Sequence, residues 1–140
     1  MIDDVTLNKA AIIRRCLARI AEDFQGDPSR LDNLTLQDAI TLNLLRACEA
    51  SIDLAMHRVA RARIGVPQTS RDAFDLLAGA GLLSEDSAKA MKNMVGFRNI
   101  AVHSYHELKR PILEAILLHH LGDFLAFSDQ NSQPPQPDSA

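Results

Sequence analysis

Aromatic residues are scarce in this chain. It has no tryptophan and one tyrosine, and aromatic residues make up 4% of its 140 positions. Hydrophobic residues still account for 46%, so the core has to be built from aliphatic side chains. Leu, Ala and Ile recur in long periodic runs, which favours helices, because strands prefer β-branched and aromatic residues. The length fits one domain with its own hydrophobic core. We therefore expect an all-α protein.

Cysteine, excess positive charge and long apolar runs are also lacking. The two cysteines, Cys16 and Cys48, each fall on an apolar helical stripe, which predicts buried free thiols and argues against a disulfide framework. A net charge of −3 excludes a general nucleic-acid-binding coat and leaves only a local basic patch for such contacts. No segment resembles a signal peptide or approaches the ~20 apolar residues that span a bilayer. We expect a cytoplasmic protein without membrane contact.

Apolar periodicity, with start and stop signals, predicts an antiparallel bundle of about five helices. The expected helices cover approximately residues 4–25, 35–64, 70–79, 85–104 and 111–127. Thr35 and Asp38 have the spacing of a capping box at the start of the second and longest helix. The segment 129–140 is rich in Pro, Gln and Ser, so we expect it to be a disordered tail. The helical domain is then residues 1–128.

Glu49, Asp53 and His57 stand four residues apart on the long helix and therefore share one face. Three interpretations remain open: metal ligands, acid and base groups, or a solvated polar stripe. Without a His-x3-His pair the spacing is not a zinc motif. We predict neither a bound metal nor a cofactor.

The densest group of reactive side chains lies in residues 96–105. Asn99 and His103 are one turn apart on a polar seam of the fourth helix, whereas Arg98 lies about 140° around the helix from His103. Arg98 and His103 therefore do not share a face. If two copies pair about a two-fold axis near this helix, Arg98 of one chain can approach His103 of the other. The wide apolar surface of the helix favours such pairing.

These residue types suit metal-independent cleavage of RNA. A histidine can remove the proton of the 2′-hydroxyl group, and an arginine stabilises charge on the phosphoryl oxygens through bidentate hydrogen bonds. Asn99 can fix the histidine or the phosphate, and the products would be a 2′,3′-cyclic phosphate and a 5′-hydroxyl. An Arg-x4-His pair also arises by chance, so the pair alone is weak evidence.

The whole string from Arg98 to Tyr105 resembles the Arg-x4-His-x-Tyr signature of HepT-type HEPN toxins. The resemblance extends over about residues 5–128 and includes the helix segment 42–53, the linker 65–72 and the pair His119-His120. It implies an all-helical, homodimeric HEPN ribonuclease of a bacterial type VII toxin–antitoxin pair. The partner implied is a MntA-like minimal nucleotidyltransferase that transfers AMP from ATP to the motif tyrosine.

By position, the resemblance makes Arg98 and His103 catalytic, Asn99 supporting and Tyr105 the modified residue. An AMP group adds bulk and negative charge, which would repel RNA phosphates from the nearby site. The alternative for Tyr105 is an ordinary turn tyrosine with its hydroxyl in water. Further residues that could line the pocket are Glu49, Asp53, His57 and His106.

Two other functions compete with the ribonuclease. The first is a catalytically silent HEPN scaffold that binds and regulates a nucleotidyltransferase partner. The second is a plain helical dimer without a role in RNA chemistry. The intact set of Arg98, Asn99 and His103 favours the ribonuclease.

Overall fold

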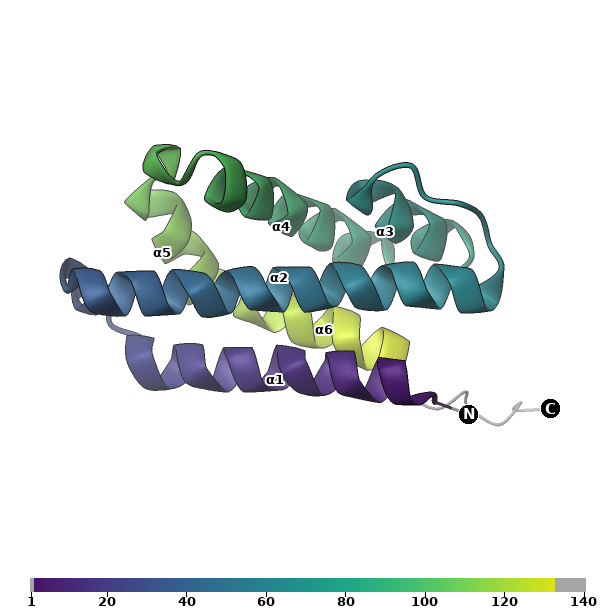
Figure 1. Ribbon diagram of the computed structural model, residues 1–140, viewed down its shortest axis with the longest axis horizontal. Coiled ribbons are helices and arrows are strands. Elements are labelled where there is room, and N and C mark those ends of the chain that lie inside the picture. Colours follow the sequence, from purple (N-terminus) through teal and green to yellow (C-terminus); the bar gives the residue numbers. More distant parts are fainter. Residues whose placement is uncertain (1, 133–140) are drawn as a thin grey trace.

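The computed structural model describes residues 2–132, which form a helical bundle without strands (Figure 1). The all-α prediction is confirmed. Its elements in chain order are α1 (Asp4–Phe24), η1 (Pro28–Asp32), α2 (Leu34–Ala62), α3 (Ser70–Gly79), α4 (Glu85–His103), η2 (Tyr105–Glu107), α5 (Arg110–His119) and α6 (Leu121–Ser132). None of these helices is long and apolar enough to cross a bilayer.

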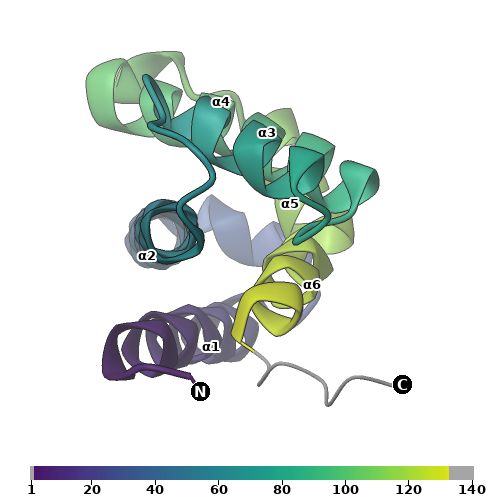
Figure 2. The ribbon, with the colours of Figure 1, turned by 90° about the vertical axis from the view of Figure 1, so that its right-hand side faces the viewer.

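Helix α2 is the spine of the bundle. Its 29 residues extend about 44 Å at 1.5 Å per residue, and it lies between α1 and α4 (Figure 1). Viewed along the bundle, α1, α2, α6 and the α3–α4 layer surround the core (Figure 2). Phe74 of α3 and Phe127 of α6 meet edge to face in that core, with ring centroids 5.4 Å apart. The remaining core is largely aliphatic, as the composition predicts.

Side-chain caps define where the helices begin. Asp3 caps α1 and Ser84 caps α4 through side-chain hydrogen bonds to amides in the first turn, because these amides have no partner inside the helix. The start of α2 differs from the predicted capping box, since Asn33 accepts from the Leu36 amide at 3.1 Å. Asp38 is therefore not a capping residue, and its carboxylate is available for a tertiary contact.

The predicted fifth helix is two helices. The chain breaks at His120, which has φ −124° and ψ 0° at the end of α5. Its Nδ1 lies 2.9 Å from Asp123 Oδ2 in the first turn of α6. Helix α6 continues to Ser132, and Gln130 accepts from the Ser84 amide at 2.8 Å. The helical region thus extends past residue 128, and residues 133–140 of the predicted tail lie outside the described residues.

Both cysteines are buried and free, as predicted. Cys48 packs where α2 meets α4, and its Sγ lies 3.8 Å from the carbonyl oxygen of Met94. Burial raises the pKa of the Cys48 thiol to about 12, so this group stays protonated and acts as a small core residue.

Candidate active site

The C-terminal end of α4, the turn η2 and the first half of α2 lie at the same end of the molecule (Figure 1). Arg98 on α4 reaches α2, where its Nε donates to Glu49 Oε1 at 2.7 Å. Its Nη1 donates to Asn99 Oδ1 at 2.8 Å. With its side chain 22% exposed, Arg98 is held in one orientation by two acceptors and keeps part of its guanidinium accessible.

His103 is the last residue of α4 and is exposed. Between residues 2 and 132, no hydrogen bond or ion pair joins it to Arg98. Arg98 faces α2, whereas His103 lies about 140° further around α4. The structure therefore keeps the two groups apart within one chain, in keeping with their five-residue separation.

Tyr105 opens the turn η2, directly after the end of α4. Its Oη donates to Asp38 Oδ1 at 2.8 Å, and Tyr105 lines a hollow of about 280 Å³ together with Thr41, Leu45 and Ala101. Burial, together with the hydrogen bond to Asp38, raises the pKa of the Tyr105 hydroxyl. The residue is nonetheless 47% exposed, so a second protein can reach it.

The other residues of the predicted pocket lie apart. Asp53 accepts from Lys9 Nζ at 3.0 Å, and His57 Nε2 lies 2.8 Å from Asp3 Oδ2. Both contacts tie α2 to α1, while Glu49 alone of the polar seam contacts Arg98. His106 is exposed on η2. Within residues 2–132, no three His, Cys, Asp or Glu side chains are grouped as metal ligands.

An apolar groove of about 720 Å³ lies along α4 on the side away from Arg98. Its apolar lining from α4 and α5 includes Met94, Phe97, Ile100, Ile112 and Ile116. Ile100 and Ile112 are each more than one-third exposed. His103 follows Ile100 by three residues and so lies on the same side of α4.

Two contacts of this site were beyond what the sequence indicated. Spacing places Glu49 on a polar seam of α2 but does not show that it meets Arg98. Asp38 has the spacing of a capping residue and gives no sign of its contact with Tyr105. One signal could have pointed to both contacts. Glu49 and Asp38 have no oppositely charged residue four positions away on α2, so each carboxylate is left to find a partner on another element.

Comparison with known proteins shows to which family the chain belongs. The model of the ribonuclease HepT-like family matches residues 9–130. The chain is 46% identical over 128 residues to the mRNA nuclease HepT of Shewanella oneidensis, which covers 91% of this chain and 96% of that protein.

Solved structures match over the same extent. The tri-AMPylated HEPN toxin of Shewanella oneidensis, solved in complex with its MNT antitoxin, superposes with a TM-score of 0.86 at 46% identity, covering 91% of this chain and 96% of that one. A toxin–antitoxin complex with AMP-PNP gives a TM-score of 0.84 at 43% identity, covering 91% and 98%.

The bundle is thus the helical fold of HEPN toxins. More narrowly, the chain belongs to the ribonuclease HepT-like family. Its enzymatic class is ribonuclease, and the family suggested by the string Arg98–Tyr105 is confirmed.

Proposed function

We propose that this protein is the toxin of a type VII toxin–antitoxin pair, an endoribonuclease that cleaves RNA without a metal ion. The observation that carries the proposal is the arrangement at the end of α4. There Arg98 is oriented by Glu49 and Asn99. His103 lies five residues further along α4 and is exposed. The solved relatives of this chain are toxins in complex with antitoxins, which supports the same assignment.

Each residue has a distinct role in the proposed reaction. His103 removes the proton of the 2′-hydroxyl, which attacks the adjacent phosphorus and displaces the 5′-oxygen. Arg98 donates hydrogen bonds to the phosphoryl oxygens as their charge grows. Glu49 accepts from the Arg98 Nε at 2.7 Å and from Nη2 at 3.5 Å, which leaves one N–H group on each of the two Nη atoms for a phosphate. Asn99 accepts from Nη1 and limits the guanidinium to one plane.

The same proposal includes a homodimer, because one chain does not bring Arg98 to His103. A second copy packed about a two-fold axis near the C-terminal end of α4 would cover the exposed side chain of Ile100 and place its own α4 end beside His103. Burial of such apolar surface favours association. The complete site then contains Arg98 of one copy and His103 of the other.

Inhibition is proposed to come from a MntA-like nucleotidyltransferase that attaches AMP to Tyr105. The relative solved as a tri-AMPylated toxin shows that a protein of this fold accepts AMP groups. Tyr105 is two residues from His103 and is 47% exposed. A bulky, negatively charged group at this position would exclude and repel the RNA backbone. We expect both partners to be cytoplasmic, with no membrane contact.

The decisive experiment expresses wild type, His103→Ala and Arg98→Ala without a partner. We expect growth arrest and RNA breakdown for wild type only, with a 2′,3′-cyclic phosphate at the cleaved ends. His119→Ala is the matched control, because it removes an exposed histidine outside the motif and should leave toxicity intact. Purified wild type should cleave in the presence of a chelator. Equal toxicity of wild type, His103→Ala and Arg98→Ala would reject the catalytic assignment.

The second candidate function is that of a member of this ribonuclease family that has lost cleavage and acts as a silent scaffold for its nucleotidyltransferase. The observation in its favour is the ion pair between Arg98 and Glu49. An arginine already paired with a carboxylate has less positive charge to offer a phosphate. Purified wild type that binds the partner and leaves RNA intact would establish the scaffold. Cleavage that depends on His103 would establish the ribonuclease.

A further inference from the structure

The hydroxyl of Tyr105 is engaged by a carboxylate of the same chain before any partner binds. Its Oη lies 2.8 Å from Asp38 Oδ1, a normal length for an O–H···O bond. Among the described residues, Asp38 makes this one side-chain hydrogen bond, and it is exposed on the first turns of α2. The pair is thus a solvent-accessible hydroxyl with an unshared carboxylate in contact with it.

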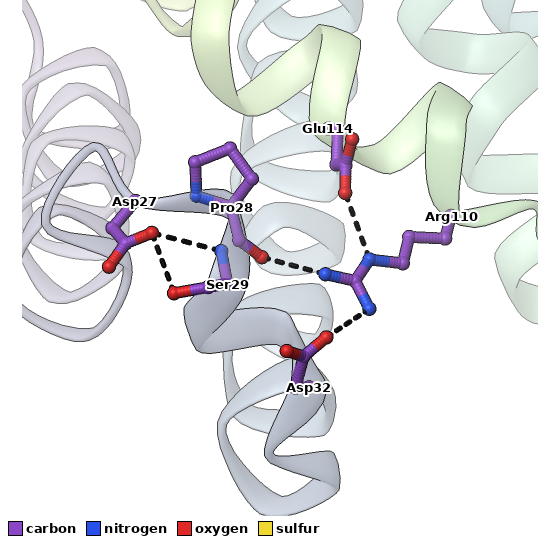
Figure 3. Close-up of polar contacts among 6 residues, drawn as sticks. All are labelled: Asp27, Pro28, Ser29, Asp32, Arg110 and Glu114. Atoms are coloured by element: carbon purple, nitrogen blue, oxygen red, sulfur yellow. Dashed lines mark hydrogen bonds and ion pairs between the residues drawn. The ribbon is translucent and has the colours of Figure 1, made fainter.

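The turn that carries Tyr105 is fixed on both sides of the residue. On one side, the Ser104 amide donates to the carbonyl of Ile100 at 2.8 Å, which continues α4 into η2. On the other side, Arg110 donates to the Pro28 carbonyl and to the carboxylates of Asp32 and Glu114 (Figure 3). These bonds hold the start of α5 against the connection that precedes α2, and so keep η2 near Asp38.

Attack by a tyrosine hydroxyl on phosphorus releases the phenolic proton, and a carboxylate already in contact with the hydroxyl can accept it. Burial and Asp38 raise the pKa of the Tyr105 hydroxyl, so the group is protonated at neutral pH and must lose its proton during attack. A carboxylate in contact with the attacking hydroxyl performs this task in protein kinases. Proton transfer by such a positioned group contributes about 10²–10⁴-fold to a rate.

We propose that Asp38 is a catalytic residue for the modification of Tyr105, and that the toxin thereby supplies the base for its own inhibition. Tyr105 Oη attacks the α-phosphorus of a nucleoside triphosphate held by the partner. The Oη–P bond forms, the bond from the α-phosphorus to the bridging oxygen breaks, and pyrophosphate leaves. The phenolic proton passes to Asp38 and then to water. This inference rests on the proposed AMP transfer.

A second consequence follows from charge. Once modified, Tyr105 has no proton to donate to Asp38, and the phosphodiester and the carboxylate are both negative. Like charges at this distance repel, so the AMP group turns away from α2. His103 is exposed at the end of α4, two residues before Tyr105, so an AMP group turned away from Asp38 can lie over it. Asp38 would thus favour both formation of the modified tyrosine and its placement over the site.

The test compares wild type, Asp38→Asn and Asp38→Ala as substrates of the nucleotidyltransferase partner with ATP and Mg²⁺, followed by intact mass against time. Asn keeps an acceptor oxygen for the hydroxyl but is a far weaker base. We expect both variants to be modified about 10²-fold more slowly than wild type, with the loss in kcat and not in the KM for ATP. Glu107→Gln removes an equal charge two residues from Tyr105 and should be modified at the wild-type rate.

The outcomes separate the two proposals. If wild type gains no mass, the proposed AMP transfer fails. If wild type gains AMP and Asp38→Asn reacts as fast, Asp38 only orients the tyrosine and its role as base is rejected. Thermal unfolding and co-purification with the partner check that each variant is folded and bound. A slow reaction caused by weak binding would appear as a raised KM for the toxin, and would also reject the role as base.

Discussion

Arg98 and Glu49 join α4 to α2 across 49 positions of sequence, through an Nε–Oε1 contact of 2.7 Å. This contact decides which N–H groups of the arginine remain for a phosphate. An arginine binds a phosphate best when its planar fork is already oriented. The ion pair is therefore a positioning contact for the proposed site.

Replacement of Glu49 by Gln should lower RNA cleavage without unfolding the protein. Gln retains an oxygen for Nε but loses the charge that holds the guanidinium in place. Groups that orient the ligands of metal sites contribute about 10–100-fold to activity, and we expect a loss of the same order here, smaller than that of Arg98→Ala. Single-turnover cleavage of a labelled RNA by purified protein measures the effect.

Asp53→Asn is the control for this change. Asp53 lies one turn further along α2 and pairs with Lys9 on α1, away from Arg98. It should cleave at nearly the wild-type rate. If both variants lose activity equally, the seam on α2 acts as one unit, and a specific role of Glu49 in holding Arg98 is disproved.

The division of the proposed site between two chains predicts complementation. Arg98→Ala and His103→Ala proteins are each expected to be inactive. Mixed after mild dissociation, they form heterodimers in which one copy supplies Arg98 and the other His103. One complete site per heterodimer should restore up to about half of the wild-type activity per dimer. Cleavage assays on the separate and mixed proteins, with light scattering to confirm dimers, provide the measurement.

Ile100→Glu in both chains gives the matching negative control. Ile100 lines the groove and is 37% exposed. A charge at this position should therefore weaken the proposed dimer more than it destabilises the fold of one chain. Loss of an apolar anchor from an interface costs about 2 kcal/mol or more, roughly a thirtyfold weaker dimer. The mixed activity should then disappear. Val66→Glu, at an exposed apolar position in the α2–α3 connection, should not affect it.

The sequence was most informative where the physics is local. The extents of α3 and α4 depend on neighbouring residues and were predicted to within one residue. The break at His120 was not, because Ile116, His120 and Phe124 continue the four-residue spacing of one helix. Only the backbone shows that the chain leaves the helix there.

Contacts between distant residues could not be predicted from spacing. Tyr105 meets Asp38 across 67 positions, because η2 folds back onto the start of α2. Nothing in the local pattern fixes that approach, and the spacing of Asp38 from Thr35 favoured a capping role instead. Asn33 takes that role. The candidate site residues could thus be proposed from the sequence, whereas their partners depended on helix packing.

The N-terminal end of α1 should make stability depend on acidity. The hydrogen bond from the Thr6 amide, followed by that from His57, holds the pKa of Asp3 well below its ordinary value of 3.8. A carboxyl group whose pKa is lowered by folding stabilises the folded state above its unfolded pKa and loses that effect as pH falls through its folded pKa. Arg61 Nε, 3.4 Å from the same carboxylate, adds to the attraction.

Asp3→Asn should therefore unfold at a lower urea concentration than wild type at pH 6. Asn is an equally good helix cap, so the difference reports the charge and not the cap. The gap should shrink as the pH falls below about 4. Asp4→Asn serves as the comparison, since it removes a charge from the same helix end without the contact to His57. A gap that stays constant between pH 6 and pH 3 would contradict the assignment to Asp3.

Replacement of Arg110 by Lys should loosen the turn that carries Tyr105. The guanidinium binds two carboxylates and the Pro28 carbonyl, which lies 2.9 Å from Nη2 (Figure 3). A lysine cannot supply this planar set of donors. The side chain is 40% exposed, so solvent screening limits the loss to about 1 kcal/mol, or a Tm lower by about 2–5 °C.

The sharper readout is local, because Arg110 restrains one segment more than the whole fold. The amides of Glu107 and Leu108 donate to the carbonyls of Ser104 and Tyr105, and their hydrogen exchange should accelerate in Arg110→Lys while the amides of α2 keep their protection. Lys109→Ala, next to Arg110 but without its side-chain bonds, should leave both groups of amides unchanged. Equal acceleration throughout the bundle would mean that Arg110 stabilises the fold globally, and the turn would then owe its position near Asp38 to α4 alone.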